Sequence, residues 1–394
     1  IQIVLDEHLQ DALAEVVLSD YDSAREHRNS LDFGNDSKGA QLTFETWLEK
    51  LKKIYSGYRD AKTKPWKFCS NRSLRIATAI LEMIHARLFP AVWNENLTRF
   101  RPGESTDTPK VERIEKFMTW WIKVWASMRD FIDGWSKYTA GFGDSLTESS
   151  WYVEKYDSGK TEAIPVTDST TGQPLINQDG TPAVDQVRLM NRMEKTKCKL
   201  YTKENFLFLK GASDIQQDPV LIEEEILYKD LEAMERKGQA LNITEKLSKH
   251  IIVPIPSGAK DDLEKERLKR IKMRNVPVKV GRWYGHYDID GTGVDESIRC
   301  IVSKDFRIYL GGVRLRDVTY SGKRPIEFTK YSDYADRPDA MQGQGLLELV
   351  RELAEEVDAC FNQLTDGNTL SVMKPGFFDP SGDLDVDAIE LAPN

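Results

Sequence analysis

Apolar positions recur at helical spacing in two segments near the start of the chain, 42–58 and 74–88. Within each segment they fall three or four residues apart, which places them on one face of a helix. Ser70 and Asn71 precede the second segment and are residue types that cap helix N-termini. We expect this helix to end at Pro90, because proline lacks the amide hydrogen that a helix interior requires.

The strongest helical pattern runs from 111 to 138 and predicts one continuous helix with a broad apolar face. A stripe of tryptophan and methionine could also line a cofactor or choline site. Packing against the protein core is the more common reason for such spacing, so we expect the face to be buried. Its residues are Ile114, Phe117, Met118, Trp121, Ile122, Trp125, Met128, Ile132 and Trp135.

Short alternating runs separated by Gly and Asp turns predict two β regions. The first is a β-rich insert within 147–215, and the second is a small β domain over 276–331. Helical patterns over 219–238 and 261–274 lie between them. Helices and strands in separate blocks predict an α+β fold.

The last helical segment carries a heptad-like apolar stripe that lasts more than two heptads. Gly343 and Gly345 precede it and lack the Lys-Ser/Thr of a phosphate loop, so we interpret them as a hinge at the helix start. A narrow apolar stripe of this kind predicts a lateral partner, which could be a second copy of the chain. Its residues are Leu346, Val350, Leu353, Val357, Cys360 and Leu364.

Composition narrows the class of protein. At 394 residues with 40% hydrophobic and 10% aromatic content, the chain can form two or three domains or one elongated subunit. No apolar run is long enough to span a membrane, so we expect no membrane-spanning helix. The net charge is −9, and residues 344–394, with two basic and eleven acidic side chains, carry all of it. This balance argues against a basic groove that clamps nucleic acid.

Familiar enzyme signatures are missing from the sequence. The four cysteines lie far apart without metal-ligand spacing, which suits a reducing compartment. None of the histidines accompanies a nucleophile motif such as GxSxG. We therefore expect a protein that is not an enzyme and has no cofactor. The histidines are His8, His27, His85, His250 and His286.

One acidic loop resembles the start of a calcium-binding loop. Asp288, Asp290, Thr292 and Glu296 supply oxygens at spacings that can surround a hard cation. Arg299 stands where such a loop needs a bidentate Glu, and strand patterns flank the loop. We expect a β-hairpin turn. The alternatives are a structural divalent cation held by these four residues, or a metal-dependent hydrolase that uses the three carboxylates.

The order of these features resembles the portal (head-tail connector) proteins of tailed bacteriophages, from about Trp47 onward. The Pro-Trp and Ser-Asn segment with its helix, 64–90, carries part of the resemblance. So does the aromatic helix that ends in GWSKYTAGFGDSL, 134–146. The most specific match is the YDIDG hairpin region, 276–331, followed by the Gly-x-Gly-Leu helix and its continuation, 343–378.

Single residues agree with the family at several points and differ at two. Asn362, Asp366 and Pro375 fall at matching places. Thr292 replaces a frequent Asp, which further weakens a metal site. Residues 311–313 read Gly-Gly-Val where the family more often continues into a Leu-Arg strand.

The resemblance implies a ring of twelve subunits at one capsid vertex, assembled in the bacterial cytoplasm and retained in the virion. Its partners would be the major capsid protein, the terminase, head-tail adaptor or tail proteins, and double-stranded DNA that passes through without sequence-specific binding. A different structural or adaptor protein of the virion, without a continuous channel, is the alternative. The implied domains are a wing (1–245), a first stem region (246–275), a clip (276–338), a second stem helix (339–372) and the start of a tunnel-loop region (373–394).

The resemblance also gives roles to residues of the second stem helix. An acidic channel wall would repel DNA phosphates and keep the duplex from sticking. The expected seam between subunits consists of Leu346, Val350, Leu353, Val357 and Leu364. The expected channel-facing carboxylates are Glu348, Glu352, Glu355 and Glu356.

Overall fold

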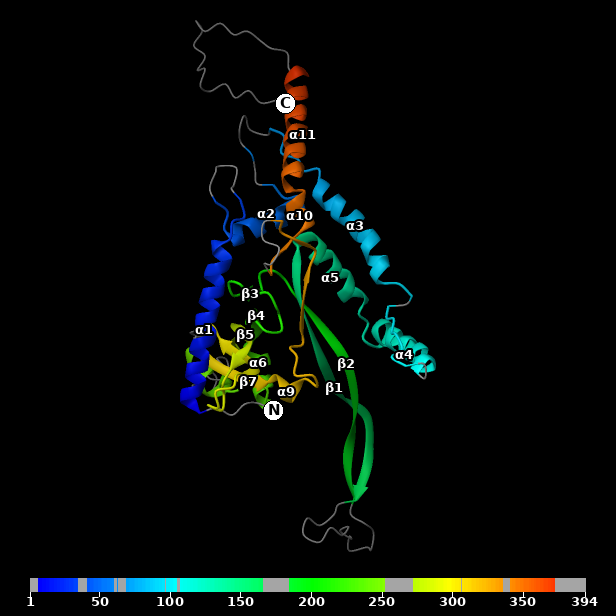
Figure 1. Ribbon diagram of the computed structural model, residues 1–394, viewed down its shortest axis with the longest axis vertical. Coiled ribbons are helices and arrows are strands. Elements are labelled where there is room, and N and C mark those ends of the chain that lie inside the picture. Colours follow the sequence, from blue (N-terminus) through cyan, green and yellow to red (C-terminus); the bar gives the residue numbers. More distant parts are fainter. Residues whose placement is uncertain are drawn as a thin grey trace, which may run out of the picture. The chain divides into compact units, whose positions relative to one another are not determined.

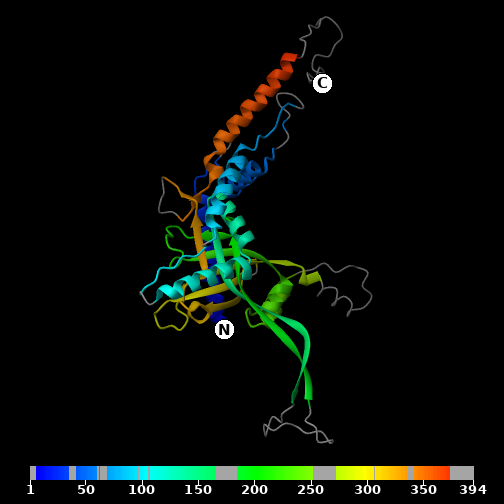
Figure 2. The same ribbon diagram turned by 90° about the vertical axis from the view of Figure 1, so that its right-hand side faces the viewer.

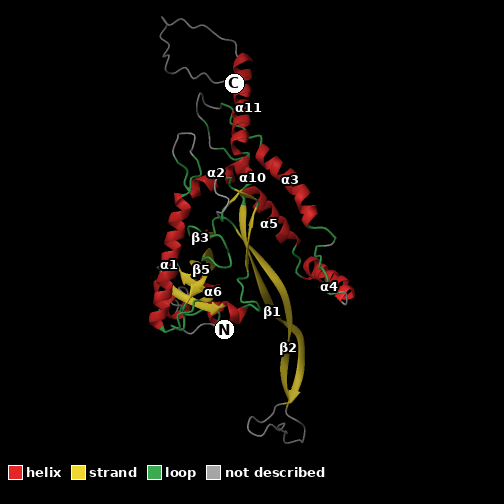
Figure 3. Cartoon of the chain, in the orientation of Figure 1, coloured by secondary structure: helices red, strands yellow, loops and turns green. Residues whose placement is uncertain are grey.

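The computed structural model contains helices and strands in a mixed α/β arrangement, in agreement with the expected α+β class (Figure 3). Two compact units can be distinguished. Unit 1 comprises 1–94, 131–148 and 200–394, and unit 2 comprises 95–130 and 149–199. The structure describes residues 6–34, 41–59, 62, 69–95, 97–104, 107–165, 184–251, 272–305, 307–335 and 341–372.

A five-stranded antiparallel sheet is central to unit 1, with the order β3-β4-β5-β6-β7. Helix α1 (Glu7–Ser30) lies along this sheet (Figure 1). The strands are β3 (Phe206–Phe208), β4 (Val220–Leu227), β5 (Pro277–Tyr287), β6 (Glu296–Ser303) and β7 (Ile308–Arg314).

Successive side chains of a strand point to opposite faces of the sheet, so the strands contribute apolar residues to a hydrophobic core on each face. In β5, Trp283 packs with α1, whereas Val278 and Val280 pack with α6 (Tyr228–Arg236) and the π-helical turn η3 (Ile243–Leu247). The sheet is therefore covered by helices on both faces. The prediction of one helix over 219–238 is wrong, since this stretch forms β4 and α6. Its first part is a strand because Val220, Leu221 and Ile222 are all buried in the sheet.

The pairing of β4 with β5 joins segments that the sequence placed in different domains. β4 lies in the expected wing, 1–245, and β5 begins the expected clip, 276–338. The expected β domain thus forms its strands, but these continue the sheet begun by β3 and β4. Two stretches lie outside the described residues, 252–271 and 373–394. The first contains most of the expected first stem region and of the helix expected at 261–274.

A long hairpin forms the expected β insert. Strands β1 (Asp144–Pro165) and β2 (Val184–Tyr201) join β8 (Ile326–Lys330) in the order β2-β1-β8. The start of β1 pairs with β8 from Asp144 to Glu148. The remaining short elements are α7 (Ser248–His250), α9 (Leu315–Val318), β9 (Ser332–Asp333) and β10 (Gly343–Gln344).

Both early helices form, as α2 (Phe44–Ser56) and α3 (Ile76–Val92). The expected stop at Pro90 is wrong, because α3 continues to Val92 and closes with a hydrogen bond from Trp93 N to Phe89 O. Proline removes only its own bond to the preceding turn. Leu88, packed against the apolar core, helps to hold the last turn of this helix.

The predicted aromatic helix is divided in three, as α4 (Thr108–Trp120), the π-helical turn η2 (Trp121–Trp125) and α5 (Arg129–Phe142). Ser127, at φ 50°, marks the break. The prediction that its apolar face is buried is wrong for α4 and η2, since Phe117 of α4 and Trp125 of η2 remain 52% and 41% exposed.

These rings form a small cluster within unit 2 instead of entering a core. Trp121 stacks on Trp151 of β1, with ring centroids 5.9 Å apart. The indole nitrogens of Trp125 and Trp151 both donate to Glu194 on β2, the first to its carbonyl and the second to its carboxylate. The aromatic stripe therefore attaches η2 to the hairpin.

Candidate functional site

Helix α11 (Arg351–Val372), preceded by the short α10 (Leu346–Leu349), carries the predicted seam. In both views the chain segment before α3 runs beside α11 (Figures 1 and 2). Asp358, Asn362 and Asp366 are four residues apart, so they project from one face of the helix toward this segment. We call these three side chains and the segment Ser70–Leu74 the clamp.

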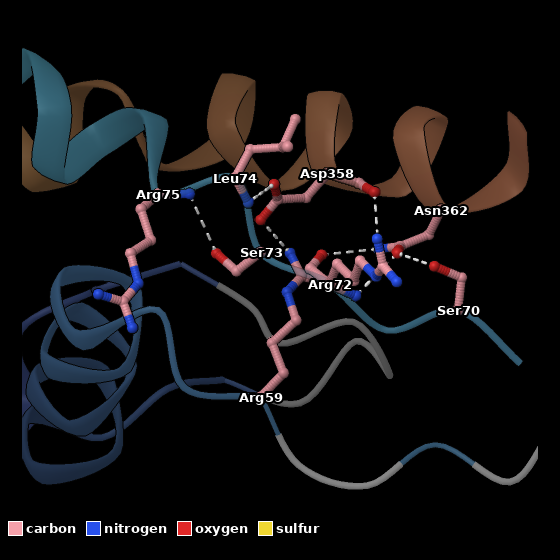
Figure 4. Close-up of polar contacts among 8 residues, drawn as sticks. All are labelled: Arg59, Ser70, Arg72, Ser73, Leu74, Arg75, Asp358 and Asn362. Carbon is pink, nitrogen blue, oxygen red and sulfur yellow. Dashed lines mark hydrogen bonds and ion pairs between the residues drawn. The ribbon is translucent and has the colours of Figure 1, made fainter. Parts of the chain in front are cut away.

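Asn362 is the centre of the clamp (Figure 4). Its Oδ1 accepts hydrogen bonds from the Arg72 backbone N–H at 2.8 Å and from the Ser70 hydroxyl at 2.7 Å. Its Nδ2 donates to the Arg72 carbonyl at 2.9 Å. Asp366 accepts from the Ser70 N–H at 2.7 Å. An extended segment cannot form a strand ladder with a helix, so these side chains satisfy its backbone groups instead.

Asp358 binds a second element to the clamp. This buried carboxylate accepts from the Leu74 N–H at 2.9 Å and, through its other oxygen, from the Arg59 guanidinium at 2.5 Å. Arg59 follows α2, and Leu74 precedes α3 (Figure 4). The first half of α11 is thereby fixed to α2 and α3 by one buried charge.

A second contact fixes the start of α10, where the backbones of Gly143, Gly343 and Gly345 touch. A Cβ on Gly143 would lie 2.4 Å from the Gly343 carbonyl oxygen, and one on Gly345 would lie 2.4 Å from the Gly141 oxygen. Gly143 also has φ +102°, a conformation that favours glycine. Gly345 is the N-cap residue of α10, as expected for a residue at the helix start, whereas Gly343 belongs to the short strand β10.

Both backbone groups of Gly343 are held by a buried ion pair. Its N–H donates to Asp144 at 2.8 Å, its carbonyl accepts from Lys203 at 2.8 Å, and the two charged side chains lie 3.2 Å apart. Burial raises the pKa of Asp144, and the nearby Lys203 charge opposes that rise. Such a pair fixes geometry because each partner would be costly to leave alone.

The clamp and the glycine contact bring together segments distant in sequence. Ser70, Gly143, Gly345, Asn362 and their neighbours all belong to segments that carry the portal resemblance. Sequence reasoning singled out Asn362 and Asp366 but missed Asp358, Arg59 and the Asp144–Lys203 pair. The four-residue spacing of Asp358, Asn362 and Asp366 was the available signal.

The structure divides the predicted seam in two. Leu346 is buried and Val350 packs against the same core, so these two belong to the interior of the chain itself. Leu353 and Leu364 are 59% and 64% exposed, and Val357 is half-buried. Among the seam residues, exposure therefore begins at Leu353, on the side of α11 away from the clamp.

The four acidic candidates have different surroundings. Glu348 accepts a hydrogen bond from the Tyr334 hydroxyl at 2.9 Å. Glu352 is exposed and lies 3.5 Å from the Arg351 guanidinium. Glu355 and Glu356 are exposed. Three of the four carboxylates are thus available to solvent.

The acidic loop after β5 forms a turn. The Asp288 carboxylate accepts from the backbone N–H groups of Thr292 and Gly293. Asp290 and Glu296 each lie 2.6 Å from the Arg314 guanidinium. The three carboxylates are engaged by backbone amides and by Arg314 and Arg316. No metal-binding group of three His, Cys, Asp or Glu side chains occurs among the described residues.

One histidine contacts a serine and an aspartate. The Nε2 atom of buried His85 lies 3.2 Å from the Ser136 hydroxyl and 3.4 Å from Asp133. A catalytic triad uses both ring nitrogens, one toward each partner. Here both contacts fall on one nitrogen, so the arrangement differs from that of an activated serine.

A buried polar network links the hairpin base to the large sheet. Arg282 of β5 lies 2.6 Å from Glu148 and 2.7 Å from Glu224, and the Tyr201 and Tyr284 hydroxyls also bond Glu148. Burial acts to raise the pKa of Glu148, but the Arg282 charge and the hydrogen bonds hold it below its ordinary value. The network holds β1 against β5.

A cleft of about 600 Å³ lies between α1, α2 and the large sheet. Its charges largely pair with one another: Lys52 with Glu204, Lys304 with Glu223, and Arg25 with Glu45. The lining therefore carries charges of both signs and presents no strong field of one sign.

Comparisons with known proteins do not supply a family. No family model matches the chain, and a search of curated proteins finds no significant relative. Within the described residues, none of the helices combines the length and apolar character needed to cross a bilayer.

Proposed function

We propose that the chain is a portal protein of a tailed bacteriophage, which assembles into a ring at one capsid vertex and forms the channel for genome packaging and ejection. The observation that carries the proposal is the difference between two sides of α11, one bound and one exposed. The clamp holds one face of this helix, while Leu353 and Leu364 on another side remain exposed. A helix anchored in this way is positioned to meet a neighbouring subunit.

The convergence of the motif segments supports the same proposal. The segment near residue 70 meets Asn362 in the clamp, and the segment near residue 143 meets Gly345 at the start of α10. In this proposal the clamp and the glycine contact set the direction of the second stem helix, 339–372.

The acidic character of α11 suits a conduit. Glu352, Glu355 and Glu356 are exposed, and carboxylates along a channel would repel the phosphates of passing DNA. The virion location, the clip at 276–338 and the capsid, terminase and tail partners belong to this proposal. In this proposal the clip strands β5, β6 and β7 share one sheet with β3 and β4 of the wing.

Negative-stain imaging of the purified protein tests the proposal. The expected result is a closed ring of about twelve subunits with a central hole. A closed assembly without a central opening would favour a different adaptor or structural protein of the virion. A compact monomer at high concentration would overturn the proposal.

A further inference from the structure

Helix α3 has an outward face that is apolar and exposed. Met83 is 55% exposed, and Ala79 and Ala86 lie on the same side, one turn before and after it. The opposite side of α3 enters the core through Ala77 and Leu81. A helix that is apolar on both sides is normally covered on both sides.

One cation borders this face. Arg87 is exposed and has no ion pair within the part of the chain that the structure describes. Glu82 on the other flank is paired with Lys137. The outward face of α3 is therefore small, apolar and bordered by one positive charge.

The exposed side of α11 has the opposite features. Leu353, Cys360 and Leu364 fall on one side of the helix at spacings of seven and four. Glu356, at the border of this stripe, is exposed and makes no ion pair with any described residue. This side presents long apolar side chains bordered by a negative charge.

We propose that the leucine stripe of α11 packs against the outward face of α3 in the next copy of the chain, with Glu356 facing Arg87. This inference rests on the proposed ring and names its contact. Branched leucines fit against a face that alternates small residues with one methionine. In this proposal Glu356 lies at the contact between subunits. Glu352 and Glu355 therefore remain as the exposed candidates for the channel wall.

The charges of Glu356 and Arg87 favour the contact of α11 with α3 over a contact of α11 with α11 or of α3 with α3. Two α11 stripes packed together would bring the Glu356 carboxylates toward each other, and two α3 faces would do so with Arg87. The pairing of α11 with α3 instead brings opposite charges together. Because it joins two different surfaces, it is heterologous and can close into a ring, whereas a self-pairing produces a twofold dimer.

A charge exchange tests the pairing. Glu356→Lys should raise the concentration needed for half-maximal ring assembly by more than about tenfold, because like charges would then meet at every contact. Adding Arg87→Glu to the same chain should restore most of the loss. Glu15→Lys on α1 makes the same charge change on a helix outside both faces, and it should leave assembly unchanged.

A crosslink gives a second, independent readout. Cys360 is naturally exposed within the stripe, so Met83→Cys places a partner thiol on α3. Mild oxidation of the assembled variant should give a ladder of covalent oligomers, and the further change Cys360→Ser should abolish it. A disulfide within one chain would give no ladder.

The outcomes separate this inference from the proposed function. Rings that persist in Glu356→Lys and give no ladder with Met83→Cys would overturn the α11–α3 contact but leave the portal proposal standing. A wild-type chain that stays monomeric would overturn both. Rescue by the charge exchange together with the ladder would establish the contact.

Discussion

Asn362 binds both backbone groups of Arg72, although the two residues are 290 positions apart. Its amide oxygen accepts from the Arg72 N–H at 2.8 Å, and its amide nitrogen donates to the Arg72 carbonyl at 2.9 Å. A side-chain amide is suited to this role because it offers an acceptor and a donor side by side. Through this contact the direction of α11 depends on the segment that leads into α3.

Replacing Asn362 should therefore destabilise unit 1. Asn362→Ala leaves the Arg72 backbone groups without partners in a part-buried site, which should cost roughly 2–4 kcal/mol in the free energy of unfolding. Gln363→Ala changes an exposed neighbour on the same helix and should stay within about 0.5 kcal/mol. Urea unfolding of both variants measures the difference. Equal stabilities would show that the clamp does not hold α11.

The glycine contact makes a similar prediction for the start of β1. Gly143→Ala should cost roughly 2–5 kcal/mol, because the new Cβ would overlap the Gly343 carbonyl and Gly143 has a positive φ. Gly134 lies within α5 with open space around it, so Gly134→Ala should stabilise by about 0.5–1 kcal/mol. Thermal unfolding of the pair provides the comparison, and destabilisation by both changes would contradict the account.

The Asp144–Lys203 pair should show strong coupling. Lys203→Met leaves the Asp144 carboxylate buried without its cation and should cost about 3–5 kcal/mol. Adding Asp144→Asn removes the unpaired charge, so the double variant should be more stable than Lys203→Met alone. Denaturant unfolding of the two single variants and the double variant gives the coupling energy. Simple additivity would mean that the pair does not act as a unit.

Acid should weaken the network around Glu148. The folded-state pKa of this carboxyl is below its ordinary value of 4.5, so its ionised form stabilises the fold above that pH. This contribution is lost as the pH falls through the folded-state pKa. Glu148→Gln should therefore be less stable at neutral pH and lose less stability than the wild type on acidification. Glu327→Gln, an exposed change on β8, should keep the wild-type pH dependence.

The sequence was a good guide wherever local pattern and packing agreed. Helix α2 formed where Leu42 to Tyr58 predicted it, between the Thr43 cap and Gly57 in the left-handed conformation. The turn after β5 formed where Asp288 and the following glycines predicted it. In both places short-range chemistry determines the conformation, so a single sequence is sufficient.

Elsewhere, tertiary contacts determined the structure, and the sequence pattern alone did not predict it. The aromatic stripe of α4 and η2 has helical spacing. Spacing cannot say whether a second layer exists to cover the stripe, and Phe117 and Trp125 remain exposed. The carboxylates Glu223 and Glu224 suggested a helix, but Lys304 and Arg282 bind them within the sheet. The clamp could be predicted only in part, because its partners are nearly 300 residues apart.

The central claim is that α11, held by its clamp, presents its leucine stripe to a neighbouring copy and so builds a ring. Native mass spectrometry of the wild type and of Leu353→Ser/Leu364→Ser tests it most directly. The account predicts a particle of about twelve 45.1-kDa subunits for the wild type and folded monomers or small oligomers for the variant. A wild-type monomer, or a variant that assembles as fully as the wild type, would contradict it.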